Sequence, residues 1–194
     1  MFKRMSVLVR RPDQDRATFS RLWERHAAPV SALPRVRGYI QNHIEEDFCP
    51  APPIRADGFV ELLWDRPEDM AAAFASEAAK PMVEDEPGFL GHGSGYALRE
   101  AEPLREAPGG KLIVVLVRDD GASLEKAAEG LSGLVRIQRD SVTALIAKPG
   151  MAPPQPAEAF LHVWFSTVEA AQNAAKSLII PGAGVFRVRT IRFV

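Results

Sequence analysis

Two segments of this 194-residue chain repeat one another without a gap. Residues 57–68 read DGFVELLWDRPE, and residues 158–169 read EAFLHVWFSTVE. Each segment is an apolar run, then a residue that can cap a helix, then a glutamate three residues later, and an alanine-rich stretch follows. A strand followed by a helix therefore occurs at the same place in two halves of the chain. This repetition constrains the fold most, because both copies are expected to adopt the same local structure.

The surrounding sequence completes both copies with the same order of elements. Apolar runs predict strands, and apolar residues at three- and four-residue spacing predict helices. In the first half we expect strands at residues 4–10, 38–44, 57–64 and 96–98. We also expect a helix with an apolar face over residues 19–33, capped by Asp13 or Asp15, and a second helix at residues 67–79. In the second half we expect strands at residues 115–118, 158–165 and 185–194, and helices at residues 124–131 and 166–177. The first half reads as β-α-β-β-α-β, and the repeat predicts the same order for the second half. This predicts domains at residues 1–106 and 111–194 with a linker at 107–110.

The two repeated strands are apolar on both faces, which indicates that both faces are buried. A β-α-β-β-α-β unit forms a four-stranded antiparallel sheet whose two helices cover one face only. The sheet of the other half is the natural cover for the second face. Burying one such face gives on the order of 10 kcal/mol of gross stabilisation at about 25 cal/mol per Å2. We therefore expect the two halves to fold together.

The predicted pocket is the space between the two sheets. Glu61 and His162 take matching positions in the repeat, and each is flanked by large apolar side chains, as polar groups in ligand pockets are. One interpretation makes them an acid–base pair that faces across the pocket. The alternative is a structural ion pair at its mouth. Phe59 and Trp164 lie in the same two strands and are expected to line the pocket.

His26 is the strongest single candidate for a catalytic group. Apolar residues at helical spacing surround it and define one face of a helix: Phe19, Leu22, Trp23, Ala27, Val30 and Leu33. Pro29 must kink or end that helix, so a titratable imidazole lies on an apolar surface beside a backbone break. One hypothesis makes His26 a general acid or base. The other makes it a buried histidine that bonds a backbone carbonyl freed near Pro29.

Three more residues and a glycine-rich segment are candidates for the pocket. Trp23, one turn before His26, is expected to line it. His43 shares a strand face with Tyr39, and the two either line the pocket or belong to a half-exposed strand surface. His92 lies in the glycine-rich residues 88–95, which lack the lysine and hydroxyl residue of a phosphate-binding loop. We therefore expect a mobile lid over the pocket at His92.

Composition narrows the classes of function. Hydrophobic residues make up 46% and charged residues 25%, as in globular proteins. The net charge of -1 gives no basic excess for nucleic acid, and no apolar run approaches the roughly 18 residues of a membrane span. Cys49 is the only cysteine, and the four histidines show no metal-ligand spacing. We expect a cytoplasmic protein that holds no metal and binds neither nucleic acid nor a membrane.

One set of spaced residues resembles a known family. The first half carries Phe19-x-x-x-Trp23-x-x-His26-x-x-Pro29, then Leu33-Pro34, Tyr39-x-x-x-His43 and Asp57-Gly58-x-x-Glu61-Leu62. Over residues 1–98 this pattern is similar to the EthD-like family of the dimeric α+β barrel superfamily. The resemblance implies an α+β barrel of two ferredoxin-like units, a central pocket for a small organic molecule, and usually no metal or organic cofactor.

The second half departs from the family pattern. It has residues 124–131 where the first half has its long helix, and it lacks equivalents of Trp23, His26 and Pro29. The chain therefore resembles a tandem fusion with a degenerate second copy, an intramolecular pseudo-dimer in place of the usual homodimer. We expect one functional pocket per chain, and a possible homodimer of the fused barrel.

Three hypotheses for the function follow. Family members are linked to ether degradation and to tailoring of aromatic polyketides. The first hypothesis is thus a cofactor-independent lyase or isomerase that moves a proton on an aromatic or polyketide-like carbonyl compound. His26 would move the proton, and Tyr39, His43 or Glu61 would orient the substrate. The second is a protein that binds a hydrophobic metabolite without chemistry. The third is a cofactor-free or haem-dependent oxidoreductase, with haem disfavoured by the lack of a clear ligand setting.

Overall fold

The computed structural model describes residues 1–98, 107–118 and 121–194. Its strands are β1 (Phe2–Arg10), β2 (Gly38–Asp47), β3 (Gly58–Trp64), β4 (Leu90–Leu98), β5 (Gly110–Leu116), β6 (Leu134–Ile146), β7 (Ala159–Phe165) and β8 (Ala183–Arg192). Its α-helices are α1 (Arg16–Arg25), α2 (Ala27–Ser31), α3 (Pro67–Phe74), α4 (Lys80–Asp85), α5 (Gly121–Glu129) and α6 (Val168–Ala175). Short 3-10 turns are η1 (Glu77–Ala79), η2 (Glu86–Gly88) and η3 (Lys176–Leu178). The domain boundary predicted at residue 106 lies outside the described residues.

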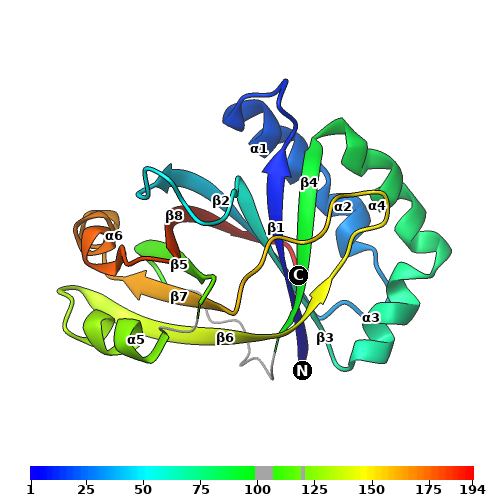
Figure 1. Ribbon diagram of the computed structural model, residues 1–194. Helices are drawn as coiled ribbons and strands as arrows, with labels where there is room; N and C mark the ends of the chain where they lie inside the picture. Colours follow the sequence, from blue (N-terminus) through cyan, green and yellow to red (C-terminus); the bar gives the residue numbers. More distant parts are fainter. Residues whose placement is uncertain (99–106, 119–120) are drawn as a thin grey trace.

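The described strands close into one antiparallel barrel in the order β1-β3-β2-β8-β5-β7-β6-β4 (Figure 1). Each half of the chain contributes four neighbouring strands. The helices lie outside the barrel, with α1 to α4 beside the strands of the first half and α5 and α6 beside those of the second (Figure 1). The protein is therefore α+β, with helices on the outer face of a closed sheet.

Apolar side chains fill the barrel and both spaces beneath the helices. Inside the barrel the larger members are Met5, Phe59, Tyr96, Ile113, Phe160 and Phe186. Every residue of the repeated strands β3 and β7 is buried, as their two apolar faces predict. The outer face of each is covered by helices and the inner face by the opposite wall of the barrel. No helix of the described residues combines the length and apolarity needed to cross a membrane.

The backbone break beside His26 follows from Pro29. α1 begins at its cap Asp15, whose carboxylate accepts the Thr18 N–H at 2.7 Å. The proline ring clashes with the carbonyl four residues earlier, which belongs to Arg25, and α1 ends at that residue. α2 then begins after His26. The imidazole is thus held at the junction of two short helices, and it is buried there.

The helix predicted at residues 67–79 is divided into shorter pieces. α3 ends at Phe74, and the chain continues through η1, α4 and η2 to Gly88. Pro81 does not end a helix, because it lies in the first turn of α4, where a missing N–H breaks no bond. α4 packs against α2. This course carries Asp85 and Glu86 beneath the helix junction that holds His26.

The glycine-rich segment is a strand. Residues 90–98 form β4, which pairs with β1 and β6, so the predicted mobile lid at His92 is wrong. Tyr96 points into the barrel, and the alternate residues Gly93 and Gly95 therefore face outward. The outer face of β4 is bare of side chains at these two positions.

Gly58 lets Trp23 pack directly on β3. A Cβ at position 58 would lie 2.3 Å from Cζ3 of the Trp23 indole. Gly58→Ala is therefore expected to lower the free energy of unfolding, measured in urea, by about 1–3 kcal/mol, because the ring must shift. Gly88→Ala is the control, since a Cβ there meets no atom within 4 Å. Equal stability of the two variants would contradict this packing.

Candidate functional site

The sheet separates the predicted site residues into two groups. Glu61, His162, Phe59 and Trp164 belong to the inner side of the barrel. Trp23, His26, Tyr39 and His43 lie on the outer side, between the sheet and the helices. His26 is therefore not in the space between the two sheets.

Charged side chains gather at one end of the barrel interior. Lys3 Nζ lies 2.7 Å from Glu61 Oε2 and 2.5 Å from Asp140 Oδ2. Lys111 Nζ lies 3.1 Å from Glu61 Oε1. His162 faces both carboxylates, with Nε2 3.0 Å from Asp140 and Nδ1 3.7 Å from Glu61. The matching positions in the repeat thus do bring Glu61 and His162 face to face.

The charges of this interior cluster balance. Burial alone would raise the pKa of Glu61, but the ammonium groups of Lys111 and Lys3 hold it well below its usual range. Burial and Lys3 oppose one another in the same way at Asp140, whose pKa is also lowered. Burial lowers the pKa of His162, so its ring is neutral at neutral pH. With no carboxylate ready to take up a proton, the geometry favours a structural ion network over an acid–base pair.

The same cluster contains a candidate ligand set for a metal. Glu61, Asp140 and His162 offer ligand atoms within 4.8 Å of one another, the one such group among the described residues. The Lys3 ammonium already contacts both carboxylates. A divalent cation would have to displace it against the attraction of two buried negative charges. These residues fit an internal lysine better than a metal ion.

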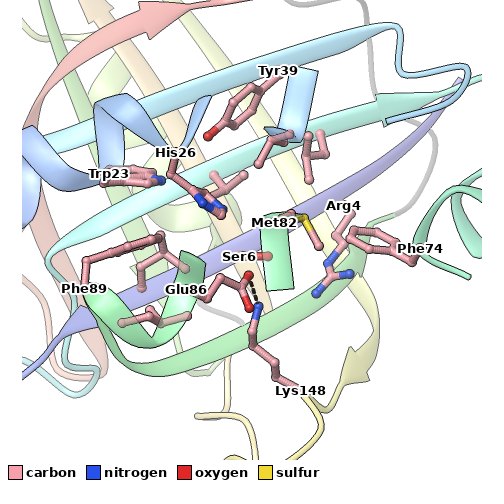
Figure 2. Close-up of a pocket in the computed structure, with 15 residues that line it drawn as sticks. Arg4, Ser6, Trp23, His26, Tyr39, Phe74, Met82, Glu86, Phe89 and Lys148 are labelled. Carbon is pink, nitrogen blue, oxygen red and sulfur yellow. Dashed lines mark hydrogen bonds and ion pairs between the residues drawn. The ribbon is translucent and has the colours of Figure 1, made fainter. Parts of the chain in front are cut away.

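A cavity of about 50 Å3 lies on the outer side, between the first-half sheet and the helices (Figure 2). Most of its walls are apolar or aromatic, and Trp23, Met82 and Phe89 are among them. The polar groups that line it are Arg4, Ser6, His26, Tyr39, Glu86 and Lys148. An apolar hollow with a few convergent polar groups is the usual form of a small-molecule site. At this volume only a small ligand fits unless side chains over the cavity move.

A hydrogen bond and an aromatic contact hold the His26 ring beside this cavity. Its Nδ1 lies 2.8 Å from Asp85 Oδ2, and its ring packs against Phe89 at 4.9 Å between centroids. Burial lowers the pKa of His26 below its ordinary 6.5, and the hydrogen bond to Asp85 opposes part of that shift. The ring is thus neutral at neutral pH. Because the carboxylate accepts from Nδ1, the lone pair is on Nε2.

The hydrogen-bond partner of His26 is a carboxylate. A backbone carbonyl freed near Pro29 was one expected partner, but the imidazole bonds the carboxylate of Asp85. Asp85 is 53% exposed and comes from α4, which is remote from His26 in sequence. A histidine oriented by a carboxylate is the arrangement of a general base.

His43 lies behind the cavity in a hydrogen-bonded row. Its Nδ1 contacts Ser20 Oγ at 2.7 Å, and its Nε2 contacts Gln41 Oε1 at 2.9 Å. The Gln41 amide donates to Tyr39 Oη at 2.6 Å and to the Trp23 carbonyl at 2.7 Å. Burial lowers the pKa of His43 to about 4, so it stays neutral. Tyr39 lines the cavity, and this row of hydrogen bonds fixes its hydroxyl. Because the hydroxyl accepts from Gln41, its own hydrogen is left to donate.

The remaining predicted residues lie elsewhere. His92 Nε2 contacts Ser94 Oγ at 3.1 Å and does not line the cavity. Trp164 stacks on His162 at 5.8 Å between centroids, and the Lys111 ammonium lies 5.0 Å from the Trp164 ring. None of the three residues His92, Trp164 and Phe59 contacts His26.

Residues that sequence reasoning missed form much of the cavity. Lys148 comes from the loop after β6 in the second half and forms an ion pair with Glu86 (Figure 2). A Cβ at Gly93 would lie 3.2 Å from Lys148 Cδ, and one at Gly95 would lie 3.0 Å from Arg4 Nη2. The glycines of β4 thus leave room for two cationic side chains to lie across the sheet. Glycines at every second position of a strand were the signal available for this close approach.

Residues 11–93 match the model of a family described as EthD domain, which confirms the resemblance over this range. No curated protein sequence matches the chain. An anthrone oxidase-like protein has a similar structure, with a TM-score of 0.60, 10% identity, and coverage of 98% of this chain and 92% of the other. A proposed monooxygenase from Fusobacterium nucleatum subsp. nucleatum has a TM-score of 0.54 at 9% identity, with coverage of 97% of this chain and 91% of the other. A proposed chlorite dismutase has a TM-score of 0.52 at 11% identity, with coverage of 97% of this chain and 95% of the other. At such identities these likenesses show a shared α+β barrel fold.

Proposed function

We propose that the EthD domain of this chain, residues 11–93, acts as a cofactor-independent enzyme that moves a proton on a small aromatic or polyketide-like carbonyl compound. The observation that carries the proposal is the hydrogen bond of 2.8 Å between His26 Nδ1 and Asp85, beside the cavity. It leaves a neutral base, with its lone pair on Nε2, in a mainly apolar enclosure.

The side chains around the cavity have distinct parts in such a reaction. Asp85 orients the imidazole and stabilises its charge once His26 has taken a proton. Tyr39 donates a hydrogen bond to the oxygen on which negative charge develops, and burial raises its pKa, so that it remains a phenol. Trp23 and Phe89 exclude water from the reacting atoms. Return of the proton to another atom gives isomerisation, and loss of a leaving group gives a lyase reaction.

An oxidoreductase is the second candidate, because structures that resemble this one include an anthrone oxidase-like protein and a proposed monooxygenase. The first step would again be removal of a proton by His26. The electron-rich carbanion would then itself supply electrons to dioxygen. A haem-dependent version does not fit, since a cavity of about 50 Å3 beside His26 leaves no room for a porphyrin.

We also propose that the barrel is an intramolecular pseudo-dimer of two ferredoxin-like units, residues 1–106 and 111–194. The strand order supports it, because β4-β1-β3-β2 of one half corresponds to β8-β5-β7-β6 of the other. Among the side chains that the structure describes, the layer beneath α5 and α6 is filled by apolar groups and has no counterpart of His26. This supports one pocket per chain for a small hydrophobic or aromatic molecule. A homodimer of the barrel and a cytoplasmic location remain predictions.

Exchange of solvent deuterium into a panel of aromatic ketones and 1,3-diketones, followed by NMR, tests the proposed reaction. Exchange faster than in buffer, and abolished by His26→Gln, is the expected result. Binding of a panel compound in the cavity without any accelerated exchange would favour the carrier hypothesis. Consumption of dioxygen in step with the compound would favour the oxidoreductase.

The pH dependence of this exchange should report on His26. The base acts only when neutral, so activity is lost as pH falls through its pKa. Burial lowers that pKa, and the midpoint of the acid limb is therefore expected below 6.5. Asp85→Asn should reduce kcat about tenfold or more and move the midpoint lower still, since Asp85 raises the pKa. Glu84→Gln, an exposed neighbour on α4, is the control, and an equal effect of both variants would contradict the role of Asp85.

A further inference from the structure

We propose that the cavity takes a small organic carboxylate with an apolar body, and that Arg4 binds the carboxylate group. The inference rests on the proposed function for identifying the cavity as the substrate site. It adds the chemical class of the substrate and a binding residue on β1.

Arg4 brings an uncompensated guanidinium to the cavity. Among the described residues it has no hydrogen bond and no ion pair, and its Nε is buried without a partner. Its guanidinium carbon lies 4.8 Å from the centroid of the Phe74 ring. Arginine stays protonated in proteins, and a buried polar group left unpaired is costly. An anionic ligand would remove that cost.

The neighbouring charges do not neutralise Arg4. The charge of Glu86 acts on the pKa of Arg4, but the carboxylate of Glu86 forms an ion pair with Lys148. Asp85 bonds His26 and faces solvent. Arg4, Lys148 and Glu86 together therefore carry one excess positive charge at the cavity. One bound carboxylate would balance it, whereas a neutral ligand would not.

The sheet holds Arg4 in position for such a ligand. The side chain lies over the bare backbone at Gly95, where a Cβ would come within 3.0 Å of Nη2, and Phe74 lies against its other side. Figure 2 shows Arg4 and Phe74 at one side of the cavity and Trp23 and Phe89 at the other. A planar guanidinium matches the two oxygens of a carboxylate. The aromatic side chains would then receive the apolar body of the ligand.

Two matched pairs of probes test the charge requirement: butyrate against butyramide, and benzoate against benzamide. Binding is followed at neutral pH by NMR shifts of backbone amides around the cavity. The carboxylates are expected to bind about tenfold or more tighter than their amides. Arg4→Met should remove this difference while leaving amide affinity within about twofold, and Arg4→Lys should keep part of it. Arg21→Met, at an exposed position on α1, is the control.

Each outcome decides the inference. Equal affinity for acid and amide in the natural protein, or no cavity shifts with any probe, would overturn it even if the Arg4 variants failed to fold. A preference that survives Arg4→Met would overturn the role of Arg4. His26→Gln should leave the preference intact, because His26 is neutral. A carboxylate preference without any His26-dependent exchange would therefore refute the proposed function and leave this inference standing.

Discussion

Replacing His26 with glutamine is expected to lower kcat of the proposed proton transfer by about 10²–10⁴-fold, the usual contribution of general base catalysis. Glutamine keeps a polar group of similar reach for Asp85 but cannot accept a proton from carbon. Affinity for substrate should stay within a few fold, because the apolar walls and Arg4 remain. The measurement is kcat and KM for deuterium exchange into the best panel compound.

His92→Gln is the matched control for the His26 variant. His92 is a half-buried histidine that bonds Ser94 outside the cavity. The kcat of the His92→Gln variant should therefore match that of the natural protein. Retention of full turnover by His26→Gln would refute the proposed mechanism. A weakened affinity in that variant, with no turnover in the natural protein, would instead indicate a binding protein.

Replacing Lys3 with methionine is expected to lower the free energy of unfolding at neutral pH by about 3–5 kcal/mol, as when one partner of a buried ion pair is lost. Lys3 contacts Glu61 and Asp140 in the barrel interior, and all three side chains are at most 1% exposed. Methionine fills a similar volume but leaves Asp140 without an ammonium partner. Urea denaturation at neutral pH measures the loss.

The size of this loss should depend on pH. In the natural protein the depressed pKa values of Glu61 and Asp140 give stability that is present above their ordinary pKa and is lost as pH falls. Without Lys3 those pKa values rise, and protonation relieves the buried charge. The difference between variant and natural protein should therefore shrink toward acid pH.

Lys80→Met separates this effect from the loss of any lysine. Lys80 pairs with Glu77 on the surface, where both side chains are largely exposed, and its loss should cost less than about 1 kcal/mol at any pH. A Lys3→Met protein no less stable than this control would show that the interior network is dispensable. A loss that grows toward acid pH would contradict the charge assignment.

Local pattern predicted strands that correspond to β1 to β5, β7 and β8 but none at β6, and the family resemblance implied the barrel. The gapless repeat between residues 57–68 and 158–169 located β3 and β7 and the helices that follow them. Their apolar character on both faces indicated a second covering layer, which the closed barrel supplies. Glu61 and His162 meet because equivalent positions of the two copies face the same interior.

The site was predicted less completely, for a physical reason. Helical spacing identifies His26 and Trp23 because their neighbours in space are also neighbours in sequence. Asp85, Glu86 and Lys148 reach the cavity through a series of short helical turns and a loop of the other half, and no local periodicity records such contacts. The alternation of side chains along each strand also defined two faces, but it did not indicate which face points into the barrel. The pocket was therefore placed between the sheets, while His26 lies outside the barrel.

The sequence by itself determined the element order, the double burial of the repeated strands and the helix that carries His26. These depend on periodicity, capping and proline, which act within a few residues. Only the tertiary structure decided which charges meet. Closure of the barrel placed Lys3 between Glu61 and Asp140, and the bare glycines of β4 let Arg4 lie unpaired beside the cavity. Such pairings depend on packing between distant segments, and they set the charge balance that the proposed chemistry requires.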